Sequence, residues 1–194
     1  MPRTPFRRAS YVIIFLRVTN YQYCMEINHI RFRPPVAEDG LPLNQLVARC
    51  PPLDTNSVYC NLLQCTDFAD TSLAADDGGR LIGFVSGYRP PARPDTLFVW
   101  QVALDVQYRG RGIAKEMLLH LFKRLQSEGI SRIETTISPG NQASEKLFLS
   151  LFRTLDLSCD KQLQFSREHH FGGQHDDEVL YRAGPAAATE SDTN

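Results

Sequence analysis

Val106-Gln107-Tyr108-Arg109-Gly110-Arg111-Gly112-Ile113-Ala114 is the stretch that decides the fold of this chain. It follows an apolar run at 96–104 that is typical of a β-strand, and it opens a run with helical periodicity. A strand, a glycine-rich turn and a helix N-terminus together form an anion site, because free backbone N–H groups converge there and the helix dipole adds partial positive charge. The glycines let the backbone approach a phosphate closely, and the two arginines add full charges. The stretch therefore predicts a site for a ligand that carries a diphosphate.

The spacing at 109–114 discriminates between phosphate-binding motifs. The stretch is neither the G-x-x-x-x-G-K-S/T motif of P-loop proteins nor a dinucleotide G-x-G-x-x-G motif with an acidic residue about twenty positions later. It resembles the R-x-x-G-x-A/G signature of the GCN5-related N-acetyltransferases, with Arg109, Gly112 and Ala114 at the signature positions. That resemblance implies acetyl-CoA as the ligand. The alternative is an ordinary strand-to-helix turn with surface arginines.

Two further segments are expected to face this cofactor. A backbone N–H near the end of the strand at 97–104 would polarise the thioester carbonyl. Asn141, which opens a predicted helix, resembles the family's second cofactor-side element, where the chain makes room for the pantetheine arm. The residues expected to hold acetyl-CoA are Val102, Leu104, Arg109, Gly110, Arg111, Gly112, Ile113, Ala114 and Asn141.

The composition is that of a globular protein, with 42% apolar and 22% charged residues. We expect a single acetyltransferase domain at 25–184. A net charge of −1 gives no electrostatic case for a nucleic-acid partner. The five cysteines include no C-x-x-C pair, which favours a reducing cytoplasm over a disulfide framework.

Both ends of the chain differ from the middle. Residues 1–24 carry arginines around an apolar run at 11–16, which is too short to span a membrane and marginal as a signal peptide. We expect a non-native-looking or disordered extension there, with Met25 as the natural start, and no membrane partner. The small, polar tail at 185–194 is expected to be disordered.

Local patterns predict the element order β-α-α-β-β-β-α-β-α-β-β. The expected ranges are a strand at 29–33, helices at 37–49 and 57–64, strands at 71–75, 80–88 and 97–104, a helix at 113–127, a strand at 132–137, a helix at 142–152, and strands at 161–166 and 179–182. This is the order of the GCN5-related N-acetyltransferase fold, an α/β fold with a mixed central sheet flanked by helices.

Three segments resemble a narrower family. They are LDTNSVYCN at 53–61, GFVSGY at 83–88 and PDTLFVWQV at 94–102, with ETTI at 134–137 downstream. Together they are similar to the diaminobutyrate acetyltransferases of ectoine biosynthesis. The resemblance implies that acetyl-CoA and L-2,4-diaminobutyrate give N4-acetyl-L-2,4-diaminobutyrate and CoA, in a homodimer. The alternative is a related acetyltransferase that acts on a polyamine or a protein terminus.

One position departs from the larger family, which often places a tyrosine where this chain has Phe148. In the family that tyrosine protonates the leaving thiolate. A phenyl ring cannot donate a proton, so another group or solvent must do so. The departure is also the only support for a further alternative, a non-catalytic acyl-CoA-binding sensor.

The implied substrate carries two ammonium groups and one carboxylate, so its pocket needs carboxylates and neutral hydrogen-bonding groups. The candidates are Asp54, Asn56, Ser57, Tyr59, Asn61 and Trp100, the last because an indole can face a cation. Three of them have plainer alternatives. Asp54 lies where a helix N-cap would, and Tyr59 and Trp100 could belong to the core.

Attack by the amine requires loss of a proton, because an ammonium has no lone pair. Glu178 is the first candidate for the general base, and His175 is the second. Both lie in a His-, Gly- and Asp-rich segment at 168–178 that could close over the substrate, be a solvated loop, or bind a metal. The spacing in this segment matches no known metal motif, and the chemistry needs no metal.

Overall fold

The structure, a computed structural model, describes residues 29–186. The predictions for residues 1–24, and for residues 187–194 of the tail, lie outside this range. Within residues 29–186, no helix has the length and apolar character needed to cross a membrane.

The described residues form one seven-stranded sheet in the order β1-β2-β3-β4-β5-β7-β6. Only β4 and β5 pair in parallel, and every other neighbouring pair is antiparallel. The strands are β1 (Ile30–Arg33), β2 (Leu73–Asp77), β3 (Arg80–Tyr88), β4 (Thr96–Leu104), β5 (Arg132–Ile137), β6 (Ser158–Phe165) and β7 (Glu178–Gly184). The predicted mixed sheet is confirmed, and the strands follow one another along the chain as predicted.

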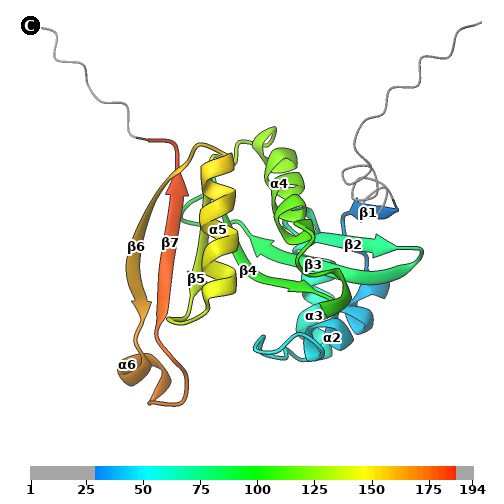
Figure 1. Ribbon diagram of the computed structural model, residues 1–194, viewed down its shortest axis with the longest axis horizontal. Coiled ribbons are helices and arrows are strands. Elements are labelled where there is room, and N and C mark those ends of the chain that lie inside the picture. Colours follow the sequence, from blue (N-terminus) through cyan, green and yellow to red (C-terminus); the bar gives the residue numbers. More distant parts are fainter. Residues whose placement is uncertain (1–28, 187–194) are drawn as a thin grey trace, which may run out of the picture.

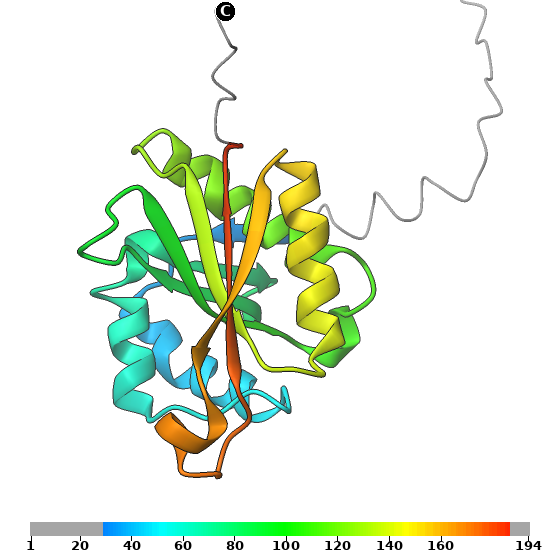
Figure 2. The same ribbon diagram turned by 90° about the vertical axis from the view of Figure 1, so that its left-hand side faces the viewer.

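Helices cover both faces of this strongly twisted sheet (Figure 1). They are α2 (Gly40–Ala48), α3 (Val58–Cys65), α4 (Ile113–Gln126), α5 (Gln142–Thr154) and α6 (Arg167–Phe171), with single 3-10 turns η1 (Ala37–Asp39), η2 (Ala69–Thr71) and η3 (Val106–Tyr108). In Figure 2, α2 and α3 lie on one side of the central strands and α5 lies on the other.

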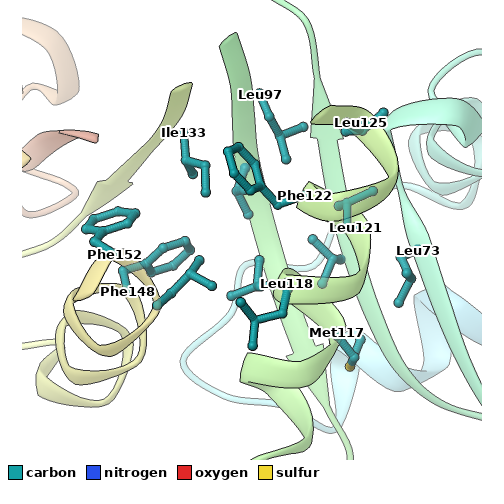
Figure 3. Close-up of a cluster of buried hydrophobic side chains, with 14 of the residues drawn as sticks. Leu73, Leu97, Met117, Leu118, Leu121, Phe122, Leu125, Ile133, Phe148 and Phe152 are labelled. Carbon is teal, nitrogen blue, oxygen red and sulfur yellow. The ribbon is translucent and has the colours of Figure 1, made fainter. Parts of the chain in front are cut away.

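Two hydrophobic clusters join these layers. In the larger one, Phe148 and Phe152 of α5 point toward Leu118 and Phe122 of α4 above the strands (Figure 3). The smaller one joins α2 to the opposite face through Leu46 and Phe84. The apolar residues of α4 recur with a 3.6-residue period, which is why one face of this helix is buried.

The central feature for function is a split between β4 and β5. Their pairing ends at Phe98 and Glu134, although β4 continues to Leu104 and β5 to Ile137. Beyond the last pair, β4 turns away from β5 in Figure 1. The edges of both strands therefore face a gap in the sheet rather than each other.

A β-bulge lies in the diverging part of β4. Its pairing with β3 passes from Ser86 opposite Gln101 to Gly87 opposite Val99, so Trp100 is the extra residue. A bulge bends its strand and re-aims the side chains around it.

Several predicted boundaries differ from the observed ones. The helix expected at 37–49 begins as the η1 turn, and the strand expected at 71–75 starts only at Leu73 because η2 precedes it. β6 begins at Ser158, three residues before its predicted start, because it pairs with the whole of β7. The segment at 168–178, expected to lack regular structure, contains most of α6.

Candidate active site

The cofactor turn, residues 106–112, links β4 to α4 as predicted. Gly110 and Gly112 have φ angles of 75° and 77°, in the left-handed region that favours glycine. Gly112 is the N-cap of α4 and provides no side-chain cap, so the first N–H groups of this helix remain available for an anion. A Cβ atom at either glycine would meet open space within 4 Å. The turn therefore presents its backbone toward open space.

The N–H groups of Val102 and Leu104 point into the split. The Asp105 N–H donates to the Ile82 carbonyl of β3 at 2.8 Å. Backbone groups alternate sides along a strand, so the neighbouring Leu104, and Val102 two residues before it, face away from β3. Consistent with this direction, the Leu104 carbonyl accepts a hydrogen bond from Arg109 Nε at 3.0 Å.

Three predicted side chains, Asp54, His175 and Glu178, form a cluster that we call the acid–histidine cluster. His175 Nε2 lies 3.7 Å from Asp54 Oδ2 and 3.9 Å from Glu178 Oε1. Asp54 comes from the α2–α3 loop, His175 from the β6–β7 connection, and Glu178 is the first residue of β7. The fold thus brings the base candidates beside the proposed substrate anchor.

Two neighbours fix this cluster beside the split. Ser138, just after β5, donates to Glu178 Oε1 at 2.7 Å. Gln101, next to the bulged Trp100, donates from Nε2 to the Asp54 carbonyl at 3.1 Å. Each contact ties a member of the cluster to one of the two strands that diverge, so the cluster lies at the mouth of the split.

His175 has a defined orientation. Its Nδ1 lies 2.8 Å from the Asp176 carbonyl, and because a carbonyl only accepts, Nδ1 carries the hydrogen. The pKa of His175 is raised by this hydrogen bond first, and then by the negative charges of Glu178, Asp54 and Asp176, while partial burial opposes the shift. Its Nε2 therefore faces the two carboxylates.

The connection that carries His175 has its own internal contacts. Ser166 caps α6, two glycines with positive φ angles end it, and Arg167 pairs with Asp176 at 3.0 Å. The ring of Phe171 lies 4.7 Å from the ring of His175. Of the three alternatives for this segment, metal binding finds no support, since residues 29–186 contain no group of three or more His, Cys, Asp or Glu that could hold an ion.

The remaining substrate candidates are distributed differently. Tyr59 is 70% exposed and Trp100 is 47% exposed, so the core alternatives for both are wrong. Ser57, and not Asp54, is the N-cap of α3, because its Oγ accepts the Cys60 N–H at 3.1 Å. The cap alternative for Asp54 is therefore also wrong.

Asn61 lies beneath this surface and is fully buried. Its Oδ1 accepts from Asn44, and its amide donates to Gln64 at 2.9 Å. Asn44 also donates to the Asn56 carbonyl at 2.8 Å. The structure therefore places the Asn61 side chain in a buried network that is bonded to the loop carrying Asp54.

Asn141 and Phe148 are both on α5. Asn141 caps the helix, with its Oδ1 accepting the Ser144 N–H at 3.1 Å. Phe148 is 3% exposed and lies in the core against Phe152.

Sequence reasoning missed Gln101, Ser138 and Asn44. Ser138 contacts the side chain of Glu178, whereas Gln101 and Asn44 donate to the main-chain carbonyls of Asp54 and Asn56, and each contact joins separate elements of the fold. No local pattern marks such a contact, although Gln101 lies within a segment that already carries the resemblance.

Comparisons with known proteins agree with this geometry. The Acetyltransferase (GNAT) family matches residues 42–152. The chain is 48% identical over 162 residues to the L-2,4-diaminobutyric acid acetyltransferase of Methylotuvimicrobium alcaliphilum, covering 84% of this chain and 94% of that protein. It is 40% identical to the protein of the same name from Halomonas elongata, covering 82% and 83% of the two chains.

Solved structures give the same result. The diaminobutyrate acetyltransferase EctA from Paenibacillus lautus, in complex with L-2,4-diaminobutyric acid and coenzyme A, matches with a TM-score of 0.77 and 37% identity, over 84% of this chain and 98% of that one. The ribosomal-protein-S18-alanine N-acetyltransferase of Escherichia coli matches with a TM-score of 0.62 at 15% identity, over 84% and 97% of the two chains, which shows the fold alone. This chain therefore belongs to the L-2,4-diaminobutyric acid acetyltransferases, within the Acetyltransferase (GNAT) family.

Proposed function

We propose that this protein transfers the acetyl group of acetyl-CoA to the 4-amino group of L-2,4-diaminobutyrate, giving N4-acetyl-L-2,4-diaminobutyrate and CoA for ectoine biosynthesis. The observation that carries this proposal is the acid–histidine cluster at the split between β4 and β5. The names of the curated relatives, and the ligands of the Paenibacillus lautus structure, support the substrate pair.

The diphosphate of acetyl-CoA binds at the cofactor turn. The first N–H groups of α4, including those of Ile113 and Ala114, meet the diphosphate oxygens, and Arg109 and Arg111 balance their charge. The pantetheine arm enters the split beside Asn141. An N–H of Val102 or Leu104 donates to the thioester oxygen, where negative charge develops during attack.

Glu178 accepts the proton that the 4-ammonium group must lose. A free alkylamine has a pKa of about 10, so only about one molecule in a thousand is unprotonated at neutral pH. Ser138 and His175 both contact Oε1 of Glu178, so Oε2 is the oxygen that takes the proton. His175 is the second choice for the general base, because its raised pKa keeps its imidazole protonated, and so unable to accept a proton, over more of the physiological pH range.

Asp54 binds the substrate, and it does not accept the proton. Its carboxylate is largely exposed and its main-chain carbonyl accepts a hydrogen bond from Gln101, so the residue presents a negative charge at the mouth of the split. The exposed Trp100 and Tyr59 supply aromatic surface near this loop, and Asn56 and Ser57 supply polar groups. An ammonium beside Asp54 gains a charge-assisted hydrogen bond.

The leaving group needs no tyrosine. An alkyl thiol has a pKa of about 8.5, so CoA can leave as a thiolate and take its proton from solvent. This agrees with the core position of Phe148. The α-amine of the substrate is the less basic of the two, so acetylation at N4 depends on how the site positions the substrate rather than on intrinsic reactivity.

We further propose that the protein is a homodimer of the cytoplasm. The edge strand β6 exposes Leu163 and Phe165, and an exposed, partly apolar edge is a surface for pairing. A second copy could cover it by a two-fold axis. Among residues 29–186, Cys50, Cys60, Cys65 and Cys159 form no disulfide, which fits a reducing compartment. Sedimentation of the pure protein tests the dimer.

An acceptor panel tests the proposed reaction. CoA release from acetyl-CoA is followed with L-2,4-diaminobutyrate, ornithine, lysine and spermidine, and the product is identified by NMR. We expect kcat/KM to be highest for diaminobutyrate, with the acetyl group on N4. Preference for spermidine or a peptide would indicate a different acetyltransferase, and binding of acetyl-CoA without turnover of any acceptor would indicate a sensor.

A further inference from the structure

The cofactor turn is tied at two points to the end of the β2–β3 hairpin. Asp77 and Arg80 face each other across the hairpin turn. Arg80 contacts Asp105, which immediately precedes the cofactor turn, and Asp77 contacts Tyr108 within it. Two neighbouring residues of the hairpin therefore hold the segment that the proposed function assigns to the diphosphate.

Asp105 is the first tie. It is 5% exposed at the end of β4, and its Oδ2 accepts from Arg80 at 2.6 Å. Arg49, at the end of α2, lies 3.9 Å from the same oxygen. The other oxygen, Oδ1, accepts the Gln107 N–H at 3.2 Å and so caps the η3 turn. One buried carboxylate thus connects the hairpin, α2 and the start of the cofactor turn.

Tyr108 is the second tie. Its hydroxyl donates to Asp77 Oδ2 at 2.7 Å, and the pKa of Tyr108 is raised, chiefly because this hydrogen bond stabilises the neutral phenol. The guanidinium of Arg111 lies over the same ring, 5.6 Å from its centroid. The tyrosine therefore links the hairpin to an arginine of the cofactor turn.

We infer that Asp105 and Tyr108 are positioning residues for acetyl-CoA. They hold the cofactor turn in its diphosphate-binding shape before the cofactor arrives. Gly110 and Gly112 give this turn more conformational freedom than other residues would. Ties that restrict that freedom in the free protein lower the cost of ordering the turn on binding, and so raise affinity. This inference rests on the proposed function.

The charge of Asp105 separates this positioning role from simple electrostatics. Asp105 brings a negative charge close to a diphosphate site, where it opposes an anion by itself. If only charge mattered, Asp105→Asn would tighten acetyl-CoA binding. If Asp105 positions the turn, the same substitution weakens binding, because an amide cannot hold Arg80 as an ion pair. The two accounts therefore predict opposite changes in acetyl-CoA affinity for the Asp105→Asn variant.

The test measures acetyl-CoA binding by isothermal titration calorimetry, with no acetyl acceptor present. We expect Tyr108→Phe and Asp105→Asn each to raise the Kd by about 3- to 10-fold, the range that the loss of one or two hydrogen bonds gives. Tyr108→Phe changes no charge at neutral pH and removes only the hydroxyl, so it remains informative if Asp105→Asn folds poorly. Thermal unfolding without ligand monitors the fold of each variant.

Arg80 and Arg89 supply a matched pair of controls. They flank β3 at its two ends, and each is partly exposed and paired with a carboxylate, Asp105 for the first and Glu128 for the second. Arg80→Ala should weaken acetyl-CoA binding by a similar factor, and Arg89→Ala should leave it unchanged. In steady-state assays, Tyr108→Phe, Asp105→Asn and Arg80→Ala should each show a higher KM for acetyl-CoA. Their kcat and their KM for diaminobutyrate should stay close to wild type.

The outcomes are distinct. Wild-type affinity in both Tyr108→Phe and Asp105→Asn, or tighter binding in Asp105→Asn, would overturn the inference and leave the proposed function intact. An equal loss in Arg89→Ala and Arg80→Ala would also overturn it. Failure of the wild-type protein to bind acetyl-CoA would instead overturn the proposed function.

Discussion

Asp54 and His175 come from opposite ends of the described chain and meet with 3.7 Å between Oδ2 and Nε2. The contact joins the loop before α3 to the connection between β6 and β7. Glu178 Oε1 lies 3.9 Å from the same Nε2 atom, so one ring nitrogen faces two carboxylates. The charge of His175 therefore depends on both.

The titration of His175 tests this relationship. The hydrogen bond to the Asp176 carbonyl and the nearby carboxylates favour the imidazolium, so the midpoint of its NMR titration should lie above the usual value of 6.5. Asp54→Asn removes one negative charge and should lower the midpoint. Asp67→Asn is the control, because it makes the same change just after α3 instead of before it, and it should leave the midpoint unchanged. A wild-type midpoint at or below 6.5, or no response to Asp54→Asn, would contradict the geometry.

The same shift has a consequence for stability. The folded pKa of His175 is raised, so the folded state binds this proton more tightly than the unfolded state. This contribution of His175 to folding stability is fully present below the pKa of His175 in the unfolded state. It is lost as the pH rises through the pKa of His175 in the folded state. The side chain is partly exposed, so solvent screens the effect.

Asp54 should act mainly on substrate binding. Asp54→Asn removes an attraction that exists before and during the reaction, so we expect KM for diaminobutyrate to rise by about 10-fold with little change in kcat. Asp67→Asn again provides the control. A fall in kcat with an unchanged KM would mean that Asp54 takes part in the proton transfer.

Gly112 should be essential for the cofactor. Gly112→Asp places a negative side chain at the N-cap of α4, where we propose that the diphosphate binds, and calorimetry should detect no acetyl-CoA binding. Gly129→Asp is the matched control, because this glycine follows the same helix with a φ of 91° and has equally open surroundings. Unchanged affinity in a folded Gly112→Asp protein would remove the basis for the cofactor site.

Stability should depend on the buried side of α2. Leu46 is fully buried and Leu41 is 53% exposed on the same helix. Leu46→Ala leaves a cavity and should lower the free energy of unfolding by about 2–5 kcal/mol. Leu41→Ala should change it by less than about 0.5 kcal/mol. Chemical denaturation measures both, and equal losses would show that the packing of α2 is misassigned.

The sequence predicted the fold well where local signals determine it. The hairpin turn at Gly78 and Gly79, the period of α4 and the glycine-rich cofactor turn each depend on nearby residues alone. The prediction failed where contacts between residues distant in the sequence determine the structure. Ser57 rather than Asp54 caps α3, and β6 is longer than its own pattern suggests because β7 pairs along it.

The candidate site shows the same division. Asp54, His175 and Glu178 were found from residue type and resemblance, but their meeting depends on the topology of the sheet. Ser138 and Gln101, which hold two of them, carry no local signal. The exposure of Trp100 follows a bulge in β4, and such an irregularity cannot be read from alternating hydrophobicity.

The kcat of Glu178→Gln, measured across pH with acetyl-CoA and diaminobutyrate, tests the central claim most directly. The amide keeps the shape of the side chain but cannot accept the proton, so kcat should fall by about 100-fold near neutral pH. The loss should shrink toward a pH of about 10, where the free amine is abundant. Glu168→Gln, an exposed change in α6 of the same connection, should keep wild-type kcat. If Glu178→Gln keeps wild-type kcat while His175→Ala loses it and recovers at high pH, the base is His175 and the assignment of Glu178 is wrong.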